Sequence, residues 1–180
     1  MALIERNNVI EGTFHTLSNA GAPTSGTTAV QTLNFAGTIT GGTFALTFGG
    51  ATTGPIAWSA TNATLVANIQ AALNALGTLG NAATVVGAGS LVAGIGGATV
   101  TFSGVNFAVS SVGLISAPPA LMLLTGAGAA LSVANTTPGV TATYRGASAG
   151  QLLSDTVNNI LYENKGVPQA PVWAKVGLDT

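Results

Sequence analysis

Charged side chains and cysteine are what this chain lacks. It has no cysteine, and none of its four Lys or Arg and five Asp or Glu lies between His15 and Arg145. Acid–base catalysis, metal binding and phosphate binding usually need carboxylate, imidazole, thiol or cationic side chains placed close together. We therefore expect no enzymatic activity, no cofactor, no metal site and no disulfide.

The shortage of charge also limits the partners. Charged residues make up 5% of the chain, against about 25% in typical soluble domains. A net charge of −1 produces no long-range field that would attract nucleic acid or an anionic membrane. A surface with so little charge has little colloidal repulsion, so we expect copies of the chain or a partner protein to cover much of it.

Targeting and membrane segments are not expected either. The first residues, MALIERNN, lack the basic start and apolar core of a signal peptide. The apolar stretch over 105–134 is longer than the roughly 20 residues of a spanning helix. Pro118–Pro119 and several glycines interrupt it, and these residues break helices.

Alternation of apolar and polar residues is the main pattern present, and it predicts β-strands. After Gly41–Gly42, residues Phe44, Leu46 and Phe48 alternate with small polar or alanine neighbours, which is typical of a half-buried strand over 43–48. The same reasoning predicts strands over 30–35, 52–58, 83–86 and 98–103, with a turn at Gly49–Gly50.

One amphipathic helix is expected near 61–76. Leu65, Ile69 and Leu73 recur at helical spacing, with Ala72 and Leu76 on the same side. Ser59 or Thr61 can cap its start, and Gly77 is expected to end it.

The last third of the chain is less regular. Short apolar runs over 107–112, 121–124, 131–134 and 140–144 predict further strands. The apolar spacing over 151–161 predicts a short second helix. Residues 160–176 predict a hairpin with arms over 160–163 and 172–176. Whether 105–144 joins the same sheet as 30–104 or forms a separate layer stays open.

Together these patterns predict a mainly β (α+β) fold with one amphipathic helix. We expect an extended N-terminal arm over 1–29, a β-sandwich or barrel-like body over 30–144, and a C-terminal helix and hairpin segment over 145–180. The arm is expected to become ordered only against a neighbour.

Four stretches of the chain resemble a known family. GGTFALTFGGATTGPIAWSATNATLVANIQAALNALGTLG, followed by GGATVTFSG and LTGAGAALSVANTTPG, resembles a β-rich module of tailed-bacteriophage structural proteins, especially capsid decoration, cement and head-fibre proteins. The closing LYENKGVPQAPVWAKVG is similar to the C-terminal hairpin of many such proteins. The resemblance covers roughly residues 39–177.

The resemblance implies a virion protein on the outer surface of the capsid. Such proteins are commonly homotrimers that sit at local symmetry axes and clamp adjacent subunits of the major capsid protein. This chain departs from the family pattern, because it has no carboxylates between the helix and the last strands, where relatives often carry a few.

Candidate contact residues are of two kinds. Aromatic side chains carry much of the binding energy of interfaces, and charged residues at the ends of the chain could pair with charges on the capsid. The alternatives are ordinary core packing for the aromatics and a solvated tail for the charges. The candidates are Glu5, Arg6, Glu11, Trp58, Tyr144, Arg145, Tyr162 and Trp173.

Two other functions fit the same sequence. A receptor- or carbohydrate-binding module of a phage fibre or adhesin would use exposed aromatic and amide side chains, for which Trp58 and Asn62 are candidates. A tail-tube or baseplate component would differ mainly in its partner. The glycine-rich stretches over 87–89 and 94–97 lack the Lys-Ser/Thr of a phosphate-binding loop.

Overall fold

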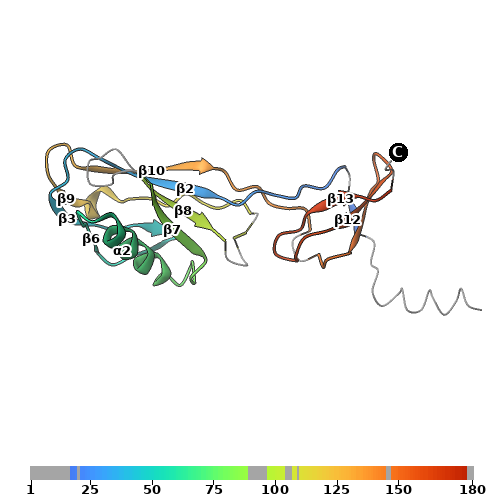
Figure 1. The fold of residues 1–180 in the computed structure, drawn as a ribbon, viewed down its shortest axis with the longest axis horizontal. Helices are drawn as coiled ribbons and strands as arrows, with labels where there is room; N and C mark the ends of the chain where they lie inside the picture. Colours follow the sequence, from blue (N-terminus) through green and yellow to red (C-terminus); the bar gives the residue numbers. More distant parts are fainter. Residues whose placement is uncertain are drawn as a thin grey trace, which may run out of the picture. The chain divides into compact units, whose positions relative to one another are not determined.

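The structure is a computed structural model that describes residues 17–19, 21–88, 97–103, 107–108, 110–144 and 147–177. It is mainly β, as the sequence predicts, and α2 (Asn62–Asn74) is the only α-helix among the described residues (Figure 1). The chain divides into two compact units. Unit 1 takes Met1–Gly26 and Thr141–Thr180, and unit 2 takes Thr27–Val140.

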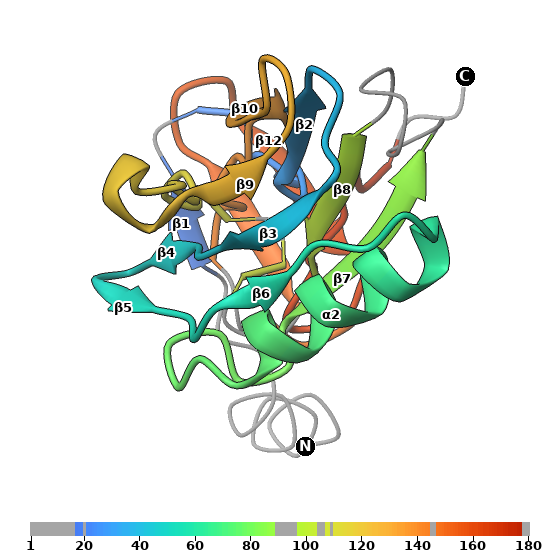
Figure 2. The ribbon, with the colours of Figure 1, turned by 90° about the vertical axis from the view of Figure 1, so that its left-hand side faces the viewer.

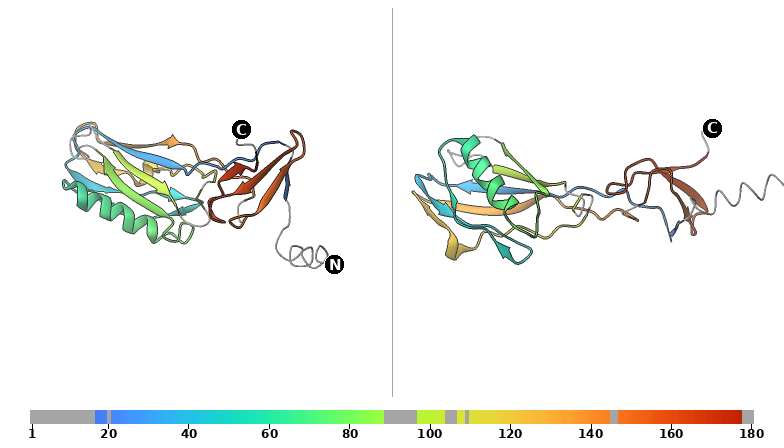
Figure 3. Two further views of the ribbon diagram at one scale, coloured as in Figure 1. Left: turned by 45° about the vertical axis from the view of Figure 1, so that its right-hand side comes forward. Right: turned by 90° about the horizontal axis from the view of Figure 1, so that it is seen from below.

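Unit 2 contains two antiparallel sheets, a small hairpin and the helix. The larger sheet has the order β10-β2-β8-β7, the smaller β6-β3-β9, and β4 pairs with β5. Helix α2 packs along β7 and β6 (Figures 2 and 3). The strands are β2 (Val30–Ala36), β3 (Gly41–Phe44), β4 (Thr47–Phe48), β5 (Ala51–Thr52), β6 (Ile56–Ala57), β7 (Ala83–Ala88), β8 (Gly97–Phe102), β9 (Leu123–Thr125) and β10 (Ala130–Thr137).

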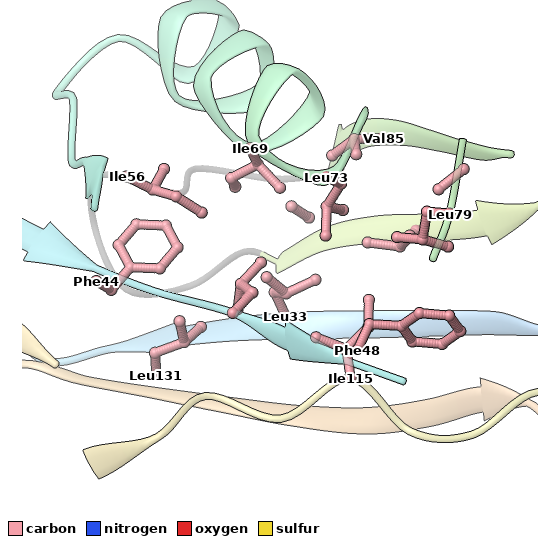
Figure 4. Close-up of a cluster of buried hydrophobic side chains, with 14 of the residues drawn as sticks. Leu33, Phe44, Phe48, Ile56, Ile69, Leu73, Leu79, Val85, Ile115 and Leu131 are labelled. Atoms are coloured by element: carbon pink, nitrogen blue, oxygen red, sulfur yellow. The ribbon is translucent and has the colours of Figure 1, made fainter. Parts of the chain in front are cut away.

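The core of unit 2 lies between α2 and the sheets (Figure 4). Strand β8 buries Ala98, Val100 and Phe102 and leaves its threonines half-exposed, which confirms the alternation in the sequence. Leu65, Ile69 and Leu73 of α2 are fully buried against this face, one helical turn apart. Burial of one such side chain contributes about 1.5–3 kcal/mol, so this face of the helix is what holds it to the sheets.

The two sheets are continuous through a ribbon of two antiparallel segments, residues 27–44 and 123–140. They pair through β2 and β10 and again through β3 and β9. Between these strands, Thr38 N–H donates to Ala127 O at 2.9 Å and Thr40 N–H to Thr125 O at 2.8 Å. Strands from 105–144 therefore join the sheets formed by 30–104.

The ribbon bends between the sheets at a group of glycines. Gly37, Gly126 and Gly128 have φ values of +76°, +128° and +67°, which L side chains rarely adopt. A Cβ on Gly126 would stand 1.8 Å from Thr38 O, and one on Gly37 would stand 2.2 Å from Gly128 O. These glycines therefore allow the backbones to approach closely enough for the ribbon to turn from one sheet into the other.

The helix is confirmed, but its ends differ from the prediction. Thr61 occupies the N-cap position without a side-chain cap, and Ser59 Oγ instead accepts the Thr61 N–H at 3.2 Å. The predicted end at Gly77 is wrong. The helix ends at Asn74 with Ala75 as the right-handed C-cap, and the chain then turns through 77–81.

Two predicted strands are interrupted in the structure. Residues 43–48 divide between β3 and β4, which belong to different sheets, and both Ala45 and Leu46 between them are buried. Residues 52–58 divide into β5 and β6, because Thr53 turns away to bond Leu46 and Pro55 has no N–H to continue a ladder.

Three other apolar runs differ from the predicted strands in whole or in part. The described residues of 107–112 form no strand, and Phe107 instead packs its ring against Phe48 and Phe102. The run 121–124 begins in a 3-10 turn, η2 (Pro119–Leu121), before β9 starts. In 140–144 only Val140 forms an isolated bridge, with Thr27. The strand predicted over 131–134 is confirmed as part of β10.

Unit 1 is built on one four-stranded sheet with the order β1-β11-β12-β13. Strand β1 pairs in parallel with β11, and the other pairs are antiparallel. The predicted hairpin over 160–176 is confirmed by β12 and β13. The strands are β1 (Leu17–Asn19), β11 (Leu152–Asp155), β12 (Ile160–Asn164) and β13 (Trp173–Lys175).

The short helix predicted over 151–161 is wrong. Asp155 Oδ1 accepts the backbone N–H groups of Val157 and Asn158 at 3.0 and 3.1 Å. Asn159 then adopts a left-handed conformation with φ +61°. Asp and Asn favour such local turns over helix interiors, so the segment folds as two strands joined by a tight turn.

Candidate interaction surfaces

Helix α2 uses two amide side chains to close sheet edges in unit 2. Gln70 Nε2 donates to Ala83 O at 2.8 Å, and its Oε1 accepts the Val85 N–H at 2.8 Å. Both backbone groups belong to the edge strand β7 and point away from its partner β8. Asn68 Nδ2 donates to Ala57 O on β6 at 2.9 Å. The helix therefore satisfies backbone groups that would otherwise be free to pair with another chain.

The edge strands of unit 1 are capped as well. The Tyr144 hydroxyl donates to Ser18 O on β1. On the other edge, Ser25 Oγ accepts the Trp173 N–H at 3.3 Å. Each outer strand of this sheet therefore has one backbone group bonded to a side chain.

Strand β10 is the exception among these edges. It runs for eight residues, ALSVANTT, with no charge and no proline. Ala130, Ser132, Ala134 and Thr136 are exposed. Among the described residues, no side chain bonds to its outward backbone groups. Natural edge strands usually carry charge, proline or a cover, so this edge is the most accessible site for strand pairing that the described residues offer.

The outer face of the larger sheet is a second uncharged surface. Thr101 lies opposite Thr84 on β7 and Val30 on β2, and Thr99 lies opposite Val86 and Thr32. Val86 is 55% exposed. The face is a grid of hydroxyl and methyl groups, which can pack against another protein without desolvating a charge.

Unit 1 holds all the charged side chains that the structure describes. Lys165 forms an ion pair with Glu163, and the two side chains are 57% and 29% exposed. Pairs of this kind contribute about 0–1 kcal/mol to stability. The two side chains therefore matter as accessible charges rather than for stability.

Asp155 is buried in unit 1 without an ion-pair partner among the described residues. Its Oδ2 accepts the Asn158 Nδ2 at 2.7 Å. This hydrogen bond, with the backbone N–H groups of Asn158, Val157 and Gly21, lowers the pKa of Asp155 below its usual 3.8 against the opposing effect of burial. These N–H donors hold the Asp155 carboxylate in the turn that joins β11 to β12.

The sequence-predicted contact residues are scattered. Tyr162 and Trp173 are buried in the core of unit 1 with Leu153, and the Trp173 indole donates to Thr143 O at 3.0 Å. Tyr144 is exposed in a left-handed conformation with φ +52°.

The remaining candidates lie elsewhere. Trp58 follows β6 in unit 2, where it packs half-buried on the core. Its indole N–H is buried and has no hydrogen-bond partner among the described residues. Four charged candidates, Glu5, Arg6, Glu11 and Arg145, lie outside the described residues.

Sequence reasoning missed the structural role of the amides. Gln31 is fully buried on β2, donates to Gly113 O and accepts the Ile115 N–H, both at 2.8 Å. It thereby ties the loop before Pro118 to the sheet. The available signal was a glutamine on the apolar side of an alternating strand, beside Leu33 and Phe35.

Neither a search for metal-binding clusters nor a comparison with known proteins adds a further site. The described residues contain no group of three or more His, Cys, Asp or Glu that could hold a metal ion. In the part of the chain that the structure describes, no helix is long and apolar enough to cross a membrane. No family model matches the chain, and no curated protein matches its sequence.

Proposed function

We propose that this chain is a structural virion protein that binds the outer surface of a tailed-phage capsid as a homotrimer and stabilises adjacent subunits of the major capsid protein. The observation that carries the proposal is the uncharged body. Unit 2 has no Asp, Glu, Lys or Arg, yet presents an open strand edge and a threonine face. Such surfaces suit burial against protein.

The mechanism is stabilisation by linkage. A protein that binds the assembled shell but not free subunits lowers the free energy of the shell alone. At a free concentration 100 times Kd, each bound site contributes about 2.7 kcal/mol. Because a trimer engages several subunits at once, its contacts act at high effective concentration.

The two units suggest a division of labour. The charged residues of the sequence all fall within Met1–Gly26 and Thr141–Thr180, the ranges of unit 1. Charge pairs set register and speed of association with a partner. We assign the contacts with capsid charges to unit 1 and the contacts between copies to unit 2.

Light scattering on the purified protein is the first test. The chain is 17.5 kDa, and a mass divisible by three chains supports the proposal. Cosedimentation with expanded phage capsids, compared with unassembled capsid subunits, is the second test. We expect binding to the shell only. A protein that is monomeric and does not cosediment with expanded capsids would refute the proposal.

A further inference from the structure

We propose that the edge of β10 pairs antiparallel with β10 of a second copy of this chain, across a twofold axis near Val133. The pairing would join two four-stranded sheets into one continuous sheet of eight strands. It goes beyond the proposed function, because it places a specific contact between copies that does not depend on a capsid.

The hydrogen bonds of the sheet define which groups of β10 point outward. Phe102 N–H donates to Ala29 O, and Ser103 N–H donates to Ala82 O. Backbone groups alternate in direction along a strand, so the even-numbered residues of β2 face β10. On β10, Ala134, Ser132 and Ala130 are the partners of Thr32, Asn34 and Ala36 in that order, so these three residues point toward β2. The N–H and C=O groups of Leu131, Val133 and Asn135 therefore point away from the sheet.

A copy of the same strand fits these groups. In an antiparallel pair centred on Val133, Val133 lies opposite its own counterpart and Leu131 lies opposite Asn135. All three outward residues on each strand then meet outward residues on the other. On the exposed face, Ser132 lies opposite Ala134, so two small side chains meet without steric conflict.

Charge and the other edges favour a copy over an unrelated partner. Residues 16–144 carry no fixed charge, so two copies approach along this edge without repulsion. The outer strands β7, β6, β1 and β13 already have backbone groups bonded to Gln70, Asn68, Tyr144 and Ser25. Strands β9, β4 and β5 are also edges, but each is only two or three residues long, against eight in β10. The longest open edge that a second copy offers for pairing is therefore its own β10.

If the proposed function also holds, this contact has a place on the shell. Trimers at neighbouring threefold positions of an icosahedral lattice face one another across twofold axes. Pairing of β10 would then link one trimer to the next. This step rests on the proposed function, whereas the pairing itself does not.

A disulfide cross-link tests the register. The natural chain has no cysteine, so Val133→Cys introduces the only thiol. Directly opposed, hydrogen-bonded residues have Cα atoms about 5.5 Å apart, within the range that a disulfide spans. We expect mild oxidation to give a covalent dimer. The matched control is Ala67→Cys on the exposed side of α2, which we expect to stay uncross-linked. Equal cross-linking of both variants, or of neither, would overturn the proposal.

A charge placed on the edge tests the pairing without oxidation. In Ala134→Lys, the two ammonium groups would be diagonal neighbours, about 7–8 Å apart at the backbone. We expect this change to halve the mass measured by light scattering. Ala67→Lys on the exposed side of α2 should leave the mass unchanged. Circular dichroism confirms that both variants are folded.

The wild-type mass separates this inference from the proposed function. Six chains, falling to three in Ala134→Lys, would support both ideas. Two chains, falling to one, would support the pairing and contradict the trimer. Three chains that do not change would support the trimer and overturn the pairing, and a monomer would contradict both.

Discussion

Uncharged amide groups take the place of ion pairs in this protein at the scale of single residues. Gln31, Gln70 and Asn164 each accept and donate hydrogen bonds with backbone groups that no strand reaches. An amide offers the same donor and acceptor as a peptide group. It can therefore complete a sheet or a loop without the desolvation penalty of a buried charge.

Asn164 provides the clearest test of this role. It is fully buried, donates to Ala147 O at 2.7 Å, and accepts the N–H groups of Gly166 and Val172 at 2.9 and 2.8 Å. Asn164→Ala would leave buried backbone groups unsatisfied, so we expect unit 1 to lose about 3 kcal/mol of unfolding free energy.

Urea unfolding monitored by Trp173 fluorescence in a Trp58→Phe background measures this loss. Gln169→Ala, which removes an exposed amide of the same unit, is the control and should change stability by less than about 0.5 kcal/mol. Equal losses in the two variants would show that the buried amide has no special role.

Asp155 makes the stability of unit 1 depend on pH. Its folded-state pKa lies below the unfolded value of 3.8, mainly because of the Asn158 hydrogen bond. The stabilisation is therefore complete above pH 3.8 and is lost as the pH falls through the folded pKa. We expect the urea concentration at the unfolding midpoint, reported by Trp173, to decrease once the pH is lowered below about 4. In Asp155→Asn the midpoint should be lower at pH 7 and decline less in acid, whereas Glu163→Gln should retain the wild-type decline.

At the scale of elements, the main feature is the bend of the ribbon at Gly37, Gly126 and Gly128. Gly126→Ala would place a Cβ 1.8 Å from Thr38 O at a φ of +128°. We expect a loss of about 2 kcal/mol or more in unit 2, because backbone must shift at the junction of the two sheets. Gly54→Ala is the matched control, since a Cβ there meets nothing within 4 Å. Thermal unfolding followed by Trp58 distinguishes the two, and similar Tm values would contradict this account of the bend.

The elements that the sequence predicted correctly are those determined by apolar spacing within a single segment. The helix spacing of Leu65, Ile69 and Leu73 and the alternation in β8 both identified the buried face correctly. In 151–161 the apolar spacing fits a helix, but the turn chemistry of Asp155 and Asn159 decides the outcome.

Other features depend on partners distant in the sequence. The pairing of 27–44 with 123–140 and of β1 with β11 joins segments about a hundred residues apart. The open edge of β10 follows from that pairing, so no local pattern could identify it.

The assembly should be insensitive to salt at the scale of the whole molecule. If copies meet through unit 2, there are no fixed charges at the contact for ions to screen. We expect the mass measured by light scattering to stay constant from about 0.05 M to about 0.5 M NaCl. A mass that falls as salt rises would instead place the contact between copies in unit 1, where the charges lie.

The sequence of unit 2 makes its unfolding free energy independent of pH. Thr27–Val140 contains no Asp, Glu, His, Cys, Tyr, Lys or Arg. A segment with no titratable side chain takes up and releases no protons when it unfolds, so its unfolding free energy is flat with pH. Trp58 fluorescence in a Trp173→Phe background should give one urea midpoint from about pH 3 to about pH 10. Any proton-driven attachment or release of this protein must therefore originate in Met1–Gly26 or Thr141–Thr180, while the body between them keeps its shape.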